Sequence, residues 1–245
     1  MRNPAKHLVD TLRSQRNLGN AEIVKGYLKT SSLGFYGIKL PIIRKLAKEH
    51  SGAVALEDSA SFLDDLWKVR VFDARRAAAE GLLQFIKRGM PPSQALGLVD
   101  AWINDIDTWA LTDPLGWCVG KLLIKSPHIR DILREWGTSE RVWRRRMAVV
   151  SYLELSVHGQ YRTQYASLIF EAVTPHLNDP EFFVGKAVGW VLRQLSVHEP
   201  QLVRRFIMEN KPRMTSLVLR ESSRKLRRQR PCGMIGFSTA SDEAD

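Results

Sequence analysis

The sequence predicts an all-α protein, a HEAT- or armadillo-like α-solenoid in which paired antiparallel helices stack to give a concave basic face. Three observations predict this fold. Apolar residues recur at three- and four-residue spacing along most of the chain. Alternation with a period of two is not sustained anywhere. Helices of similar sequence return at a repeat-like interval, and 245 residues are enough for an elongated array with a sizeable core.

Breaker and capping residues set the helix boundaries. An apolar pattern that begins at Phe62 stops at Gly89, and a new helix is expected from Ser93. Ser126 is expected as an N-cap with Pro127 at the first helical position. We expect nearly all of residues 4–228 to be helical. In chain order the clearest helices cover residues 62–88, 93–105, 108–123, 126–136, 143–156, 183–196 and 198–212.

Internal repetition carries more information than any single helix. Aligning the helices by residue type places four residues in one column, at spacings of 34, 37 and 40: Arg75, Trp109, Arg146 and Lys186. The column four residues later holds Ala79, Asp113, Val150 and Trp190. This regularity favours a solenoid over a non-repetitive helical bundle. Since the second helix of each pair lines the concave face, the cations of the first column are expected to form a track there. The alternative is three solvated charges that are unrelated to one another.

The chain is expected to form a single repeat domain over residues 1–230. The segment 220–230 is strongly basic, and it could reach a phosphate backbone or serve as a solubilising extension. Residues 231–245 have no periodicity and end in acids, so a disordered tail is expected there.

The balance of charge points to an anionic partner. The net charge is +11 and the pI is about 9.9, an excess that attracts nucleic acid or an anionic surface. Two distant cysteines and six scattered histidines predict neither a disulfide framework nor a metal site. No apolar run has the length of a membrane span or of a signal peptide core. We therefore expect a cytoplasmic protein that needs no membrane, no metal and no cofactor, and a monomer.

Trp109, Asp113 and Trp190 are the candidate catalytic residues. Taken singly, each tryptophan would be a core residue, and an aspartate before Pro114 would belong to a turn or a helix start. Taken together in a basic groove, a carboxylate and two indoles can stabilise a cation. Cleavage of a glycosidic bond passes through a sugar of oxocarbenium character, which such a carboxylate stabilises while it orients a water molecule.

Three motifs resemble the AlkD-type alkylpurine DNA glycosylases, which are built from HEAT-like repeats. They are Trp109-Ala-Leu-Thr-Asp113, Val142-Trp-Arg-Arg-Arg146 and the stretch from Phe183 to Arg193, which contains KAVGWVLR. A Gly-Ile-x-x-Pro element at residues 37–41 is also similar to one in this family, and the likeness extends from about residue 8 to residue 226.

The resemblance implies hydrolysis of the glycosidic bond of cationic N3- or N7-alkylated purines in double-stranded DNA, without metal or cofactor. Asp113 would stabilise the sugar cation between Trp109 and Trp190. Arg146 would hold the phosphate near the lesion, Arg193 would make a further backbone contact, and Tyr27 would lie at the DNA surface. Apart from the resemblance, we expect Lys186 and Arg75 of the aligned column, and Lys39, to add phosphate contacts.

Two other classes of function compete with this one. A non-catalytic helical-repeat module that binds damaged or branched DNA would keep the cations, but a carboxylate facing phosphates would be repulsive in it. A protein-interaction solenoid would have a groove of mixed or apolar character. Fold alone does not decide among the three.

Overall fold

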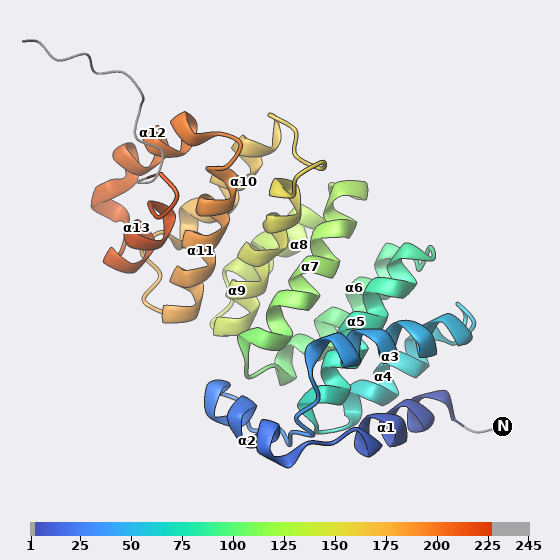
Figure 1. Ribbon diagram of the computed structural model, residues 1–245. Coiled ribbons are helices and arrows are strands. Elements are labelled where there is room, and N and C mark those ends of the chain that lie inside the picture. The colour runs from blue at the N-terminus through green and yellow to red at the C-terminus, as the bar shows by residue number, and fades with distance from the viewer. Residues whose placement is uncertain (1–2, 227–245) are drawn as a thin grey trace, which may run out of the picture.

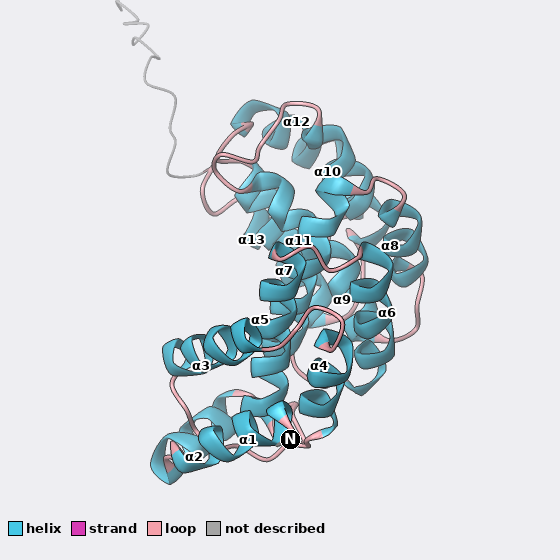
Figure 2. Ribbon diagram, turned by 90° about the vertical axis from the view of Figure 1, so that its right-hand side faces the viewer, coloured by secondary structure: helices cyan, strands magenta, loops and turns pink. Residues whose placement is uncertain are grey.

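The computed structural model describes residues 3–226, and the regular secondary structure of this part of the chain is helical, with one isolated bridge between Gly34 and Val71. The helices form two layers, and the layers bend into an arc (Figure 2). The all-α fold and the solenoid of paired helices are thereby confirmed.

One layer lines the inside of the arc. Its helices follow one another side by side, each packed against the next (Figure 1). They are α3 (Leu40–Ala53), α5 (Phe72–Lys87), α7 (Trp109–Lys125), α9 (Val142–Val150) with the 3₁₀ helix η2 (Ser151–Ser156), α11 (Phe182–Leu195) and α13 (Ser216–Ser222).

The other layer covers the outside of the arc (Figure 2). It contains α4 (Ser59–Lys68), α6 (Pro92–Trp102), α8 (Ile129–Gly137), α10 (Tyr165–Val173) and α12 (Pro200–Asn210), with the 3₁₀ helices η1 (Ile103–Asp105), η3 (Thr174–His176) and η4 (Lys211–Arg213). At the N-terminal end, α1 (Pro4–Ser14) packs on α3 and α4.

Helix α2 (Leu18–Tyr27) stands apart from both layers, at one edge of the arc (Figure 2). Its approach to the rest of the protein depends on Gly37, which has φ +76° and lies against Ala21. A Cβ atom at position 37 would lie 2.4 Å from the Ala21 nitrogen, so only glycine fits here.

Two predicted helices are divided in the structure. The pattern predicted as one helix over 62–88 breaks into α4 and α5, because Val71 is extended and Phe72 N–H donates to the Gly34 carbonyl. The apolar periodicity runs through this break, so it carried no signal of the bridge. The helix predicted over 143–156 changes to 3₁₀ geometry at Ser151. The helix predicted from Ser126 starts later, with His128 as its N-cap.

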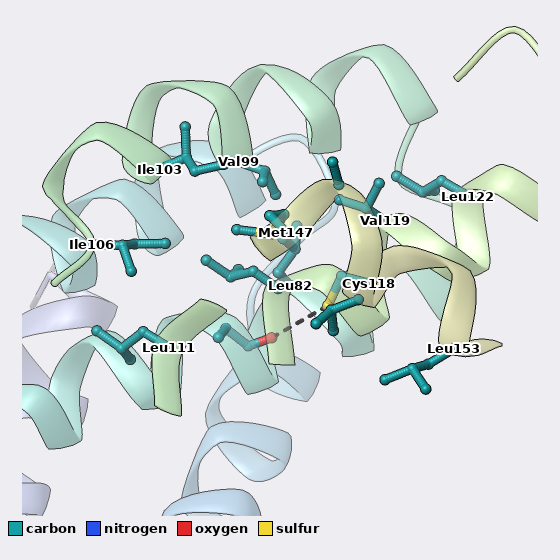
Figure 3. Close-up of a cluster of buried hydrophobic side chains, with 14 of the residues drawn as sticks. Leu82, Val99, Ile103, Ile106, Leu111, Cys118, Val119, Leu122, Met147 and Leu153 are labelled. Atoms are coloured by element: carbon teal, nitrogen blue, oxygen red, sulfur yellow. Dashed lines mark hydrogen bonds between the residues drawn. The ribbon is translucent and has the colours of Figure 1, made fainter. Parts of the chain in front are cut away.

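The core fills the space between the layers. Figure 3 shows part of it, with Leu82, Val99, Leu111 and Met147 meeting from four different helices. Cys118 lies in this cluster, with its Sγ atom 3.7 Å from the Ala79 carbonyl oxygen. Large aliphatic side chains that interdigitate in this way hold successive repeats together.

No helix in the described range is both long and apolar enough to cross a bilayer. The tail expected over 231–245 lies outside the described residues, as do positions 227–230 of the basic segment.

Candidate functional site

The starts of four concave helices define a row of side chains across the inner face. The fifth residues of α5, α7, α9 and α11 are Arg76, Asp113, Arg146 and Lys186. Two of them make the same contact. Arg76 Nη1 donates to the Ala110 carbonyl at 2.9 Å, and Arg146 Nη1 donates to the Phe183 carbonyl at 2.5 Å. Each carbonyl belongs to the second residue of the next concave helix, so the four helices are in register.

This register corrects the predicted one. Arg76 takes the place that was predicted for Arg75, and Asp113 takes the place that was predicted for Trp109. Trp190, the ninth residue of α11, corresponds to Trp117 and not to Asp113. The predicted alignment was out of register because the connections between repeats differ in length and because similar residue types occupy neighbouring positions.

Asp113 and Arg146 form a two-point ion pair between α7 and α9. Arg146 donates from Nε to Oδ1 at 2.9 Å and from Nη2 to Oδ2 at 2.8 Å. The Arg146 side chain is 6% exposed, whereas 16% of the Asp113 side chain is open to solvent. Burial raises the pKa of the Asp113 carboxyl, and the charge and hydrogen bonds of Arg146 oppose that shift. Each carboxylate oxygen keeps a second lone-pair site for water.

Pro114 explains how Asp113 is accommodated inside α7. Proline has no N–H, so the Ala110 carbonyl, four residues earlier, loses its helical donor. Arg76 supplies the missing donor from α5. The Asp-Pro pair, which read as a turn or a helix start, therefore lies within the helix, because a neighbouring repeat satisfies the freed carbonyl.

Trp109 lies one turn before Asp113, on the same face of α7. Its half-buried indole meets the Tyr27 ring edge-on, with 5.7 Å between centroids. Tyr27 ends α2 and is 71% exposed. The connection after α2 is fastened to the start of α7, because Ser32 donates its backbone N–H and its hydroxyl to Asp107 Oδ2 at 2.6 and 2.9 Å.

Trp190 is half-buried on α11, two concave helices away from Trp109, and the two indoles make no direct ring contact within the described range. Lys186 and Arg193 lie one turn before and three residues after Trp190, so they share its face of the helix. Both cations bind the buried carboxylate of Glu221 in α13, at 3.0 and 2.9 Å.

The predicted cationic track is wrong at Arg75. This side chain is enclosed between layers, donates to the Trp67 and Asp105 carbonyls, and lies over the Trp67 ring. At 3% residue exposure it has no surface to offer to a phosphate. Lys39, by contrast, is exposed at the start of α3.

Sequence reasoning missed two residues that shape the site. Arg76 completes α7 at Pro114, and Glu221 gathers the cations around Trp190. Arg76 is found only by counting from the start of α5, which the apolar periodicity did not reveal. Glu221 lies within a basic segment, where a single acid gave no signal. No cluster of three His, Cys, Asp or Glu side chains suited to a metal ion occurs within residues 3–226.

Several solved structures share the fold. A protein from Enterococcus faecalis, described as a predicted DNA alkylation repair enzyme, superposes with a TM-score of 0.74 at 23% identity, over 86% of this chain and 97% of its own. The protein smu.31 from Streptococcus mutans superposes with a TM-score of 0.60 at 17% identity, over 76% of this chain and 92% of its own. AlkD2 from the same species gives 0.60 at 15% identity, over 76% and 90%. No curated protein sequence is significantly similar to the chain.

The sequence itself matches one family, that of the DNA alkylation repair enzymes, over residues 8–226. This range takes in all of α2 to α13, and with them every residue of the candidate site. The protein therefore belongs to the DNA alkylation repair enzyme family and has a role in DNA repair.

Proposed function

We propose that the protein is a DNA glycosylase that hydrolyses the N-glycosidic bond of cationic N3- or N7-alkylated purines in duplex DNA. The observation that carries the proposal is the Asp113 carboxylate on the concave face, held at two points by Arg146 and still partly open to solvent. A carboxylate fixed in this way is preorganised for a cation that develops in front of it.

The chemistry needs few groups. An alkylated purine already carries positive charge on its ring, so it leaves as a neutral base when the C1′–N bond breaks and needs no protonation by the enzyme. The deoxyribose then has oxocarbenium character, which the Asp113 carboxylate stabilises. A water molecule hydrogen-bonded to the same carboxylate adds to C1′ and gives its proton to that carboxylate, which passes it on to solvent, so the products are the free purine and an abasic deoxyribose.

Aromatic and cationic residues complete the proposed site. Trp109 and Trp190 present indole faces to the sugar of the damaged nucleotide, and Tyr27 extends the surface at the edge of α2. Lys186, Arg193 and Lys39 provide contacts to the phosphate backbone. In this proposal Arg146 orients Asp113 rather than holding a phosphate, because its Nε, Nη1 and Nη2 atoms all donate hydrogen bonds to protein oxygens.

The ion pair between Asp113 and Arg146 also decides which measurement distinguishes an enzyme from a non-catalytic DNA-binding module. An unpaired carboxylate would repel phosphates, but Asp113 is neutralised by Arg146, so DNA binding alone does not distinguish an enzyme from a non-catalytic module. Release of base does. The test incubates the purified protein with methylated duplex DNA in the presence of a chelator and measures free 7-methylguanine. The proposal expects release that depends on Asp113, whereas binding without release supports the module.

A further inference from the structure

Helix α11 approaches α13 closely along one face. Gly185 and Gly189, one turn apart, lie against Leu217 and Glu221, also one turn apart. A Cβ atom on Gly189 would come to 2.3 Å from the Glu221 Cβ. The glycine therefore lets the Glu221 backbone sit against α11 and directs its carboxylate along that helix.

The Glu221 carboxylate is buried and surrounded by cations. Lys186 Nζ binds Oε1 at 3.0 Å, while Arg193 and Arg224 bind Oε2 at 2.9 and 3.0 Å. Glu221 is 2% exposed, but its partners reach solvent, with 37% of the Lys186 side chain and 23% of the Arg193 side chain open. Burial disfavours the charged carboxyl, yet the bonds from Lys186 and Arg193 outweigh it, so the pKa of Glu221 is lowered.

The same packing occurs once more, without the ring of cations. Gly116 and Gly120 of α7 lie against Val150 and Glu154, and Glu154 is also 2% exposed. Its Oε1 accepts from Lys121, but its Oε2 is buried without a hydrogen-bond partner. Packing against a glycine therefore accounts for a buried glutamate, and it leaves unexplained why Glu221 collects three cations.

We propose that Glu221 is a positioning residue that holds Lys186 and Arg193 on either side of Trp190 and releases them to the DNA backbone. The inference rests on the proposed DNA-binding role of this face. Arg220 Nε also lies 3.9 Å from Glu221 Oε1, so four cations surround one carboxylate and leave a net charge of +3 in the cluster. A phosphodiester carries the same charge as the carboxylate, so exchanging one for the other leaves the charge of the pair unchanged. Cations held ready in this way lose less rotamer freedom when DNA arrives.

Glu221→Gln tests the proposal through the affinity for undamaged duplex DNA and its salt dependence. Without the competing carboxylate, binding becomes tighter at each salt concentration. The logarithmic salt slope stays close to the wild-type value, because the same cations reach phosphates in both proteins. On damaged DNA, KM falls and kcat does not rise, because the gain is uniform binding.

Glu154→Gln is the matched control, since it removes an equally buried glutamate packed on a glycine, and its affinity for undamaged duplex DNA should stay close to the wild-type value. If Glu221→Gln leaves the affinity unchanged or weakens binding, Glu221 is purely structural and the proposal fails.

Arg193→Gln, with Glu221 intact, covers the case in which Glu221→Gln does not fold. Its slope should be smaller by about 0.9, and an unchanged slope would show that Arg193 stays on Glu221 in the complex. These binding measurements need no base release. A protein that binds as expected but frees no purine refutes the glycosylase and leaves the role of Glu221 standing.

Discussion

Replacing Asp113 by Asn separates the chemical role of the carboxylate from its structural role. The substitution keeps one oxygen that can accept from Arg146. It replaces the other oxygen, which lies 2.8 Å from Arg146 Nη2, by an amide nitrogen, so that two donors face each other. Removing one partner of a buried ion pair costs about 3–5 kcal/mol, and the retained acceptor places this variant near the lower end. For a domain of this size, that loss lowers the melting temperature by roughly 6–12 °C.

The rate of base release should fall by much more than partial unfolding of the variant would explain. Removing a preorganised electrostatic contact to a transition state lowers the rate by about 10²- to 10³-fold. Binding to undamaged DNA should be retained, because a negative charge has been removed from a face that meets phosphates. Melting curves, duplex binding and release of 7-methylguanine are measured on the same preparation, well below the melting point of the variant.

Asp179→Asn is the control for this experiment. Asp179 pairs with Arg145, the neighbour of Arg146, through Nε at 2.7 Å and Nη2 at 3.3 Å, and both side chains are similarly buried. Its melting temperature should fall by a comparable amount while base release persists. Wild-type release by Asp113→Asn, or equal loss of release in both variants, would refute the catalytic role of Asp113.

Three further predictions address the site and its support. Burial raises the pKa of Asp113, and the proposed mechanism uses its ionised form, so base release should decline with falling pH from a higher pH than the ordinary aspartate value of about 3.9; a decline only near that value would contradict the assignment. Gly120→Ala should cost about 1–3 kcal/mol, since its Cβ would lie 2.4 Å from a backbone oxygen, whereas Gly97→Ala, in open space within α6, should stabilise by about 0.5–1 kcal/mol; melting curves distinguish the two. Cys118, with its pKa raised to about 12 by burial, should react with a thiol reagent only after denaturation in a variant whose other cysteine is replaced by serine, and fast labelling of the native protein would show that the core opens.

The sequence predicted the fold because the apolar periodicity of a helix is a local property. It also identified the helices that carry Trp109, Asp113 and Trp190. It could not locate the break between α4 and α5, because the bridge that makes it joins Val71 to Gly34, far away in the chain.

Side-chain partners were harder to predict than helices. Arg75 and Arg76 are neighbours in sequence with similar chemistry, and only the packing shows that the first faces the interlayer core and the second faces α7. Likewise, Arg146 read as an available cation because its acceptors lie on two other helices, 33 and 37 residues away in the chain. The number of cations counted from the sequence therefore overstates the number that are available to a ligand in the groove.

The bridging position of Arg146 has a consequence for how this architecture can change over evolutionary time. One guanidinium ties α7 to α9 and α9 to α11, so three consecutive repeats must be inherited together for Asp113 to be held in place. Duplication or loss of a repeat outside this trio lengthens or shortens the arc and leaves the Asp113–Arg146 pair intact. An insertion within the trio would separate Asp113 from Arg146, and we expect lineages that shuffle repeats there to keep the scaffold and lose the proposed base release.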